Sequence, residues 1–335
     1  MEKLSKEEKR FYLIWQRQRE NIWGHHYEPG IRAIRAEAPG ASKPSLVYWP
    51  KHSRDLHLMS SAELAACLLA LYNPRLIDIQ EQKLLSPVPA PHPLQGHPMH
   101  AKAHAKSFEG TVAVAERLRL TQHIGWIWVT PLGRTGERDN GNAISPRLRV
   151  PQPWLGDLLL CLDGPVGIYC VNWSVKLASG DHGRPHGMRL GGGVSRRRLE
   201  KAHARHTIER AYYLDAGIPT REVSKDLVTK DLFDNLASLY GVACRPMPLP
   251  DSHREDMECE FAAGIQSQTP PLQVCDRQLL KHRVPREISL RVLYRGIWRR
   301  SIRAELCAGP LLPDAPLTAE RQDVLSAYAA WFAEE

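Results

Sequence analysis

The sequence lacks paired cysteines and long apolar runs. Its seven cysteines contain no CxxC pair, and several lie inside apolar segments, as expected of reduced and buried thiols. A disulfide framework and a zinc ribbon are therefore not expected. The apolar run LAACLLALY is much shorter than the roughly 20 residues that a membrane helix needs, so no membrane partner is expected.

Signals for export and for nucleotide binding are also missing. The first residues, MEKLSKEEKRFYLIWQRQRE, are charged from the second position on, and they contain neither the continuous apolar core nor the small-residue cleavage site of a secretory signal. We therefore expect a cytoplasmic protein. Neither GxGxxG nor GK[ST] occurs in the chain, which disfavours an ATP site.

Length and charge describe what is present. A chain of 335 residues can form two domains and a core that needs no disulfide or metal. The formal net charge of +8 favours a polyanionic partner, although basic clusters are often only solvated faces. The arginines that we expect at a DNA surface are Arg196, Arg197, Arg198, Arg299, Arg300 and Arg303.

Three polar residues at the ends of apolar segments form a candidate active site. Glu63 begins an apolar helix for which Ser60 or Ser61 is a plausible N-cap. Asp157 opens, and Lys176 closes, the segment GDLLLCLDGPVGIYCVNWSVK, whose Asp-Gly-Pro predicts a β-hairpin. Because the two ends of a hairpin face each other, at a Cβ spacing of about 4.5–5.5 Å, we expect Asp157 beside Lys176.

Two carboxylates and a lysine are the residue types needed for metal-dependent cleavage of a phosphodiester. Mg²⁺ or Mn²⁺ prefers carboxylate and carbonyl oxygens and lowers the pKa of an attacking water. We expect Glu63, Asp157 and the main-chain carbonyl of Val175 to be ligands, and Lys176 to hold the water or offset charge. The alternative is that Glu63 stabilises its helix and that Asp157 and Lys176 are ordinary strand-end residues.

A histidine-rich stretch is a weaker candidate for a metal site. His92, His97, His100 and His104 lie in a proline-rich segment, which is typical of an exposed loop. No cysteine or acidic residue accompanies them at ligand spacing, so a zinc role is disfavoured.

The order of the remaining segments predicts the fold class. A helix, a strand in LIDIQEQKLL, the hairpin, a helix over about 195–216 and a strand in TREVSKDLV predict an α/β protein with a mixed sheet flanked by helices. We expect residues 24–57 to be irregular. We divide the chain into an N-terminal helix and basic arm (1–53), a core domain (54–228, with an insertion at 86–149) and a C-terminal domain (229–335).

Four blocks of sequence resemble the TnsA family, the endonuclease subunit of bacterial heteromeric (TnsABC-type) transposases. They are RDLHLMSSAELAACLLALYNPRLIDIQEQKLL, then GDLLLCL with VNWSVK, then IERAYYLDAGIP, then REVSKDLV, and they span roughly residues 54–228. The resemblance implies a restriction-endonuclease-like fold followed by a small, mostly helical, winged-helix-like C-terminal domain.

The resemblance also implies roles for single residues. Glu63 and Asp157 match the metal ligands of the family, and Lys176 matches its catalytic lysine. Where the family usually has Gln or Glu two residues before the lysine, this chain has Ser174, whose hydroxyl could reach a metal only weakly or through water. Gln82 matches a recurrent position whose role we leave open.

The function implied is cut-and-paste transposition. Family members cleave the 5′ strand at each transposon end, while a TnsB-like recombinase acts on the 3′ ends and a TnsC-like AAA+ ATPase regulates both. The expected partners are thus double-stranded DNA and these two proteins. Two alternatives remain open, namely a restriction or repair nuclease of the same fold and a catalytically inactive DNA-binding adaptor.

Overall fold

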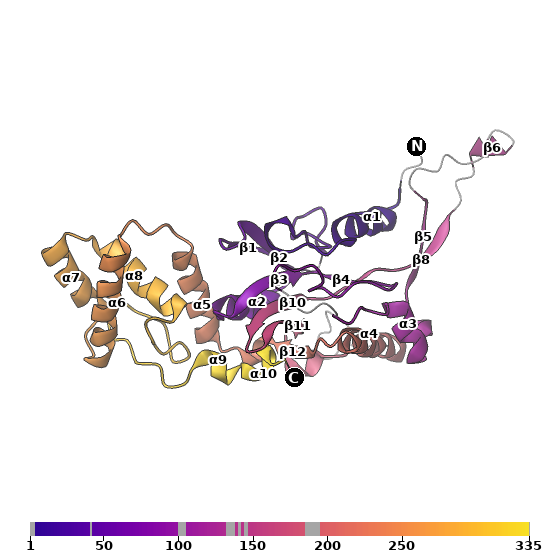
Figure 1. Ribbon diagram of the computed structural model, residues 1–335. Coiled ribbons are helices and arrows are strands. Elements are labelled where there is room, and N and C mark those ends of the chain that lie inside the picture. Colours follow the sequence, from indigo (N-terminus) through magenta and orange to yellow (C-terminus); the bar gives the residue numbers. More distant parts are fainter. Residues whose placement is uncertain are drawn as a thin grey trace.

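A four-stranded mixed sheet lies at the centre of the fold (Figure 1). The computed structural model describes residues 4–40, 42–99, 105–131, 147–184 and 195–334, with the backbone of 138–139 and 142–143. The strand order is β12-β11-β10-β3, in which β10 is antiparallel to both neighbours and β11 is parallel to β12. The predicted mixed sheet is confirmed. Its strands are β3 (Leu76–Glu81), β10 (Leu158–Gly164), β11 (Gly167–Lys176) and β12 (Thr220–Ser224).

The hairpin of β10 and β11 was predicted from its turn and forms as expected. Its register pairs Leu158 with Trp173 and Gly164 with Gly167. Gly164 is required at the turn because a Cβ there would lie 2.7 Å from the carbonyl oxygen of Gly167. Successive side chains point to opposite faces, and both faces of the hairpin are apolar, so the sheet is covered on both sides.

Two helices cover the sheet on its opposite faces. Helix α2 (Ser61–Tyr72) packs on the face that contains Trp173, and nine of its twelve residues are buried. Helix α4 (Arg196–Asp215) packs on the other face together with α3 (Thr111–Arg117). Among the helices within the described ranges, none is both long and apolar enough to cross a membrane.

The N-terminal region contains a hairpin that the sequence did not predict. Helix α1 (Lys6–Gln18) is followed by β1 (Ser45–Trp49) and β2 (Arg54–Leu58), which pair antiparallel within the stretch expected to be irregular. The expectation was wrong because β1 is apolar on both faces, with Leu46 and Tyr48 exposed, so the polar alternation of a half-buried strand is absent. The predicted boundary after residue 53 falls in the turn of this hairpin.

Short strands lie within the predicted insertion and in the segments on either side of it. Three antiparallel pairs form, β4 with β9, β5 with β8 and β6 with β7. Their bounds are β4 (Leu84–Leu85), β5 (Trp126–Val129), β6 (Arg138–Asp139), β7 (Asn142–Ala143), β8 (Leu148–Pro151) and β9 (Trp154–Leu155). In Figure 1 the β5–β8 pair extends away from the central sheet.

The C-terminal region is helical, and its first four helices gather at one end of the molecule in Figure 1. Its last two helices return to the sheet, where Trp173 donates from its indole nitrogen to the carbonyl oxygen of Trp331 at 2.6 Å. One hydrophobic cluster continues from the sheet into these helices, so the core is not interrupted at residue 229. The helices are α5 (Lys230–Ala243), α6 (Asp251–Gln266), α7 (Pro271–His282), α8 (Arg286–Arg299), α9 (Val324–Ala327) and α10 (Ala329–Phe332).

Candidate active site

Asp157 and Lys176 lie next to each other at the open end of the central hairpin. The Nζ atom of Lys176 is 3.4 Å from Oδ2 of Asp157, and it donates to the carbonyl oxygen of Val175 at 3.0 Å. The same Oδ2 accepts the main-chain N–H of Val175 at 2.7 Å. The pairing of two antiparallel strands has therefore closed a sequence gap of 19 residues. The catalytic role of the two side chains stays a prediction.

Glu63 is held in the first turn of α2 by four hydrogen bonds. Ser60 is the N-cap, because its hydroxyl accepts from the N–H of Glu63 at 3.1 Å and donates to Oε1 at 3.0 Å. Oε2 accepts the N–H of Met59 at 2.9 Å and the side-chain amide of Gln82 at 3.0 Å. The carboxyl group is thus fixed in position at a buried helix terminus rather than free to rotate.

The electrostatics of Glu63 link it to the other two residues. Burial raises the pKa of Glu63 to about 7, and the negative charge of Asp157 adds to this rise. The ammonium group of Lys176 acts in the opposite direction. All three predicted residues therefore belong to one electrostatic cluster, in which two carboxyl groups repel each other and a single ammonium group partly compensates them.

Gln82 connects the residues that carry the two carboxyl groups. Its main-chain N–H donates to the carbonyl oxygen of Asp157 at 3.1 Å, while its side chain donates to Glu63. Its φ of +52° lies in the left-handed region, which is uncommon for residues other than glycine. Strained backbone of this kind is concentrated at functional sites. We therefore expect Gln82 to position Glu63 relative to Asp157, a role that the sequence had left open.

Ser174 is almost fully buried in β11, with 2% of its surface exposed. In the parallel register with β12, Ser174 lies opposite Glu222. Because Ser174 lies two residues before Lys176, the side chains of Ser174 and Lys176 point to the same face of the sheet. The buried position suits a small side chain.

Glu209 is a carboxyl group near this site that sequence reasoning missed. It is buried on α4, where Oε1 accepts from the side-chain amide of Asn172 at 3.2 Å. Burial and the charge of Asp157 raise the pKa of Glu209, and Arg205, Asn172 and Lys176 oppose the rise. A signal was present, because Glu209 lies between Ile208 and Tyr212 on the apolar face of the helix, where an acidic residue is unusual.

The donor set of this site fits a hard divalent cation. Asp157 Oδ2 and the Val175 carbonyl oxygen already share one cation, the ammonium group of Lys176. A metal ion held by Glu63 and Asp157 would relieve the repulsion that raises the pKa of Glu63. Within the part of the chain that the structure describes, no three His, Cys, Asp or Glu side chains gather as a metal-binding group. The predicted set instead combines two carboxylates with a main-chain carbonyl and a hydroxyl.

The histidine-rich stretch has local roles where it is described. Nδ1 of His92 accepts the N–H of Leu94 at 3.0 Å, and Nδ1 of His97 accepts the N–H of Met99 at 3.2 Å. These bonds fix turns two residues ahead of each ring. His100 and His104 lie outside the described residues.

The arginines predicted to contact DNA fall into two groups. Arg196, Arg197, Arg198 and Arg299 are exposed. Arg300, which is partly buried, and Arg303, which is exposed, both pair with Asp323, and the guanidinium carbon of Arg300 lies 5.3 Å from the ring centroid of Tyr72. These two side chains hold the C-terminal segment against the helical core, which gives them a structural role whatever they do with DNA.

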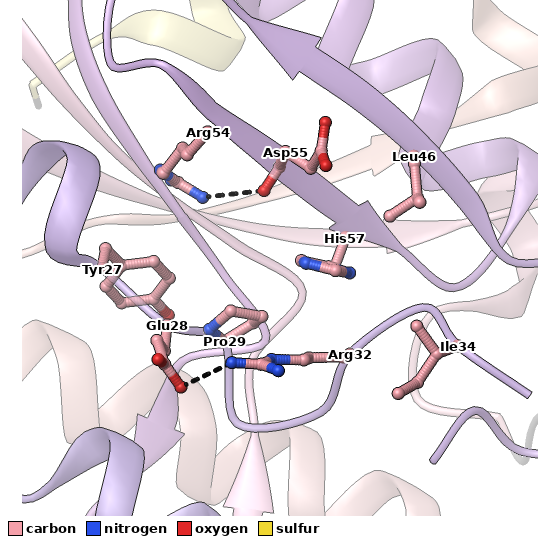
Figure 2. Close-up of a pocket in the computed structure, with 9 residues that line it drawn as sticks. All are labelled: Tyr27, Glu28, Pro29, Arg32, Ile34, Leu46, Arg54, Asp55 and His57. Carbon is pink, nitrogen blue, oxygen red and sulfur yellow. Dashed lines mark hydrogen bonds and ion pairs between the residues drawn. The ribbon is translucent and has the colours of Figure 1, made fainter. Parts of the chain in front are cut away.

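A separate cavity of about 330 Å³ lies between the N-terminal loop and the β1–β2 hairpin. Figure 2 shows its wall, where Glu28 pairs with Arg32 at 3.0 Å and the Arg54 side chain points toward Tyr27. None of Glu63, Asp157 and Lys176 lines it. Acidic and basic groups are both present in the wall, so the cavity has no dominant charge.

No known family model matches this chain, and no curated protein matches it either.

Replacing Glu63 with glutamine should stabilise the metal-free protein at alkaline pH. The folded pKa of about 7 exceeds the ordinary value of 4.5, so the folded state binds more protons between these values and stability falls as pH rises through them. Glutamine removes the charge and can keep the bonds to Met59 and Gln82. We expect a higher Tm than wild type at pH 8 in EDTA, with a gain that disappears below about pH 4.5. A gain independent of pH would contradict this.

Proposed function

We propose that the chain is a Mg²⁺-dependent DNA endonuclease subunit of a TnsA-type transposase that cleaves the 5′ strand at transposon ends. The supporting observation is the cluster of Glu63, Asp157 and Lys176 at the open end of the central hairpin. These residues are far apart in the sequence, yet Lys176 contacts Asp157 and both act on the pKa of Glu63. The mixed sheet with helices on both faces is compatible with the restriction-endonuclease-like fold that the resemblance implies.

Each residue of the site has a separate role in the proposed reaction. A divalent cation bound by Glu63, Asp157 and the Val175 carbonyl would neutralise phosphoryl charge and acidify an attacking water. Lys176, fixed by Asp157 and Val175, presents an ammonium group that can hold a water or a phosphoryl oxygen. In the metal-free protein the pKa of Glu63 is raised to about 7, and a bound cation would favour the carboxylate form that serves as a ligand. Gln82 keeps Glu63 oriented.

The partners in this proposal are double-stranded DNA, a TnsB-like recombinase and a TnsC-like AAA+ ATPase. The helical region from α5 to α10 would correspond to the winged-helix-like domain of the family and would provide the contacts with partners. Within residues 225–334 the described strand pairing is one isolated bridge between Ala304 and Ala319, so the helical character of the region is what supports this correspondence.

Reconstituted cleavage of transposon ends tests the proposal. The purified chain is mixed with a TnsB-like recombinase, a TnsC-like ATPase, Mg²⁺ and a labelled transposon end, and the cut strand is identified on a denaturing gel. We expect a cut in the 5′ strand at the end, dependent on both the chain and Mg²⁺. Cleavage of DNA that lacks transposon ends would instead support a restriction or repair nuclease.

Ser174 favours a second candidate function, that of a catalytically inactive DNA-binding adaptor. A hydroxyl replaces the usual Gln or Glu at this position, and it is a weaker metal donor. In this case the chain would bind DNA and partners, and the 5′ strand would stay intact in the reconstituted reaction even at high Mg²⁺.

Changing Ser174 to alanine distinguishes a metal-shell role from a packing role. If the hydroxyl supports the metal directly or through water, the alanine variant should need roughly tenfold more Mg²⁺ for half-maximal cleavage. The loss of one buried oxygen leaves the strand intact, so Tm should hardly change. Identical Mg²⁺ titrations for the two proteins would show that the residue only fills space.

A further inference from the structure

A second cavity lies where the N-terminal hairpin meets the C-terminal helices. Its volume is about 190 Å³. The end of β1 and the following turn, the last turn of α2, and helices α5 and α8 form its walls. The lining residues are Trp49, Pro50, Lys51, Leu71, Tyr240, Ala243, Cys244, Arg295, Trp298 and Arg299.

The wall of this cavity is positively charged. It contains Lys51, Arg295 and Arg299 and no acidic residue, in contrast to the cavity in Figure 2, whose wall includes Glu28 and Asp55. Burial lowers the pKa of Lys51, and burial together with the nearby guanidinium group of Arg299 lowers the pKa of Arg295. Arg295 and Arg299 therefore repel each other, and such a pair of guanidinium groups favours the binding of an anion.

Two of the three cations are fixed in place by neutral acceptors. Lys51 Nζ donates to the carbonyl oxygen of Leu76 at 2.8 Å. Arg295 Nη1 is 3.5 Å from the carbonyl oxygen of Arg245, at the long limit for a hydrogen bond. Carbonyl oxygens orient these groups without cancelling their charge. The carboxylates of Asp78 and Glu258, which do not line the cavity, oppose the lowering of the pKa of Lys51 and of Arg295 respectively, so the positive charge is partly compensated.

Three aromatic residues, Trp49, Tyr240 and Trp298, also line the cavity. Trp298 packs edge-on against Tyr240, with ring centroids 5.0 Å apart, and against Tyr72 at 5.4 Å. Trp49 lines the opposite part of the cavity from β1. Aromatic rings beside arginines are the means by which proteins bind single-stranded nucleic acid, because bases stack on the rings and phosphates contact the cations.

We propose that this cavity binds one unpaired nucleotide of a DNA strand. Its phosphate would contact Arg295, Arg299 and Lys51, and its base would lie against Trp298. The choice of DNA as the anion rests on the proposed function. A stacked base in a duplex could not enter a concave wall of this kind, which is why the strand must be unpaired.

Fluorescence anisotropy with full-length protein and labelled oligothymidylate, at several salt concentrations, tests the proposal. The slope of the logarithm of the binding constant against the logarithm of the salt concentration, called the salt slope below, should become shallower by about 0.7 per lost phosphate contact in the Arg295→Gln/Arg299→Gln variant. Trp298→Leu should bind at least roughly fivefold more weakly with the slope unchanged. The matched control is Lys281→Gln/Arg286→Gln, which removes two exposed cations from α7 and α8 and should bind as wild type does.

Conservative variants keep the test informative if folding suffers. Arg295→Lys retains the charge and should restore most of the slope, and Trp298→Phe retains an aromatic face and should restore most of the affinity. Equal salt slopes for the Arg295→Gln/Arg299→Gln variant and its control would overturn the proposal. Equal losses of affinity on single-stranded and duplex DNA would also overturn it, in favour of a general basic surface.

The nucleotide-binding proposal can fail or succeed independently of the proposed nuclease activity. If end cleavage fails in the reconstituted reaction while the effects of Arg295 and Trp298 persist, the nucleotide site stands without the nuclease. If cleavage succeeds and these effects are absent, the nucleotide site is wrong and the nuclease stands.

Discussion

Asp157→Asn should reduce cleavage of transposon ends on the order of a thousandfold while leaving the fold intact. Asparagine has nearly the same shape, and its carbonyl oxygen can still accept the N–H of Val175, now bonded at 2.7 Å. It lacks the negative charge that holds the Lys176 ammonium at 3.4 Å and that a divalent cation requires. Losing several kcal/mol of charge stabilisation, at about 1.4 kcal/mol per factor of ten, gives an effect of this size.

Two further measurements separate a catalytic from a structural effect of Asp157. Asp163→Asn is the matched control, because the same substitution is made in the exposed turn of the same hairpin, and it should cleave as wild type does. Asp157→Asn should also lower the pKa of Glu63, since the repulsion from Asp157 contributes to its rise. Retention of more than about a tenth of the activity in Asp157→Asn would rule out Asp157 as an essential residue.

Local signals explain which parts of this site were predictable. The Asp-Gly-Pro turn and the flanking apolar runs specify the hairpin, and the hairpin alone places Asp157 beside Lys176. Ser60 was identifiable as an N-cap from residue type and position. Each of these features depends on a few neighbouring residues, which is the range over which sequence patterns are informative.

Other features depend on packing between distant segments. Glu209 reaches the neighbourhood of Asp157 only because α4 lies on one particular face of the sheet. Gln82 has a left-handed backbone at the junction of β3 and β4. The sequence does not signal this conformation, because the residue there is not a glycine. The pairing of Arg300 and Arg303 with Asp323 spans twenty residues or more, so a basic cluster in the sequence became partly an internal ion-pair network.

A buried ion pair lies next to the candidate active site, and we expect it to contribute to the free energy of unfolding. Arg54 on β2 donates from Nη1 to both carboxylate oxygens of Glu81 at the end of β3, at 2.9 and 3.0 Å. Oε1 of Glu81 also accepts the N–H of His57 at 3.1 Å. Glu81 is fully buried and directly precedes Gln82. The pair therefore fixes the strand end from which Gln82 reaches Glu63.

Arg54→Met should reduce the free energy of unfolding by about 3–5 kcal/mol, because it leaves the carboxyl group of Glu81 buried without its counterion. Urea denaturation measures the change. The double variant Arg54→Met/Glu81→Leu removes both charges of this pair and should recover part of the loss, because the buried Asp78, whose Oδ1 lies 3.8 Å from Nη2 of Arg54, still loses the arginine. Arg196→Met is the matched control, since it breaks an exposed pair with Glu200 and should have no resolvable effect.

The pH dependence of the Arg54→Met loss identifies its cause. Burial raises the pKa of Glu81 above its ordinary value of 4.5, and Arg54 opposes the rise, so the folded pKa should be higher still in the variant. A raised folded pKa adds stability below the unfolded value, and this stability is lost as pH rises through the folded one. The deficit of Arg54→Met relative to wild type should therefore be largest at alkaline pH and should shrink toward pH 4.5. A deficit that is constant with pH would mean that the variant lost packing around the arginine side chain rather than charge compensation of Glu81.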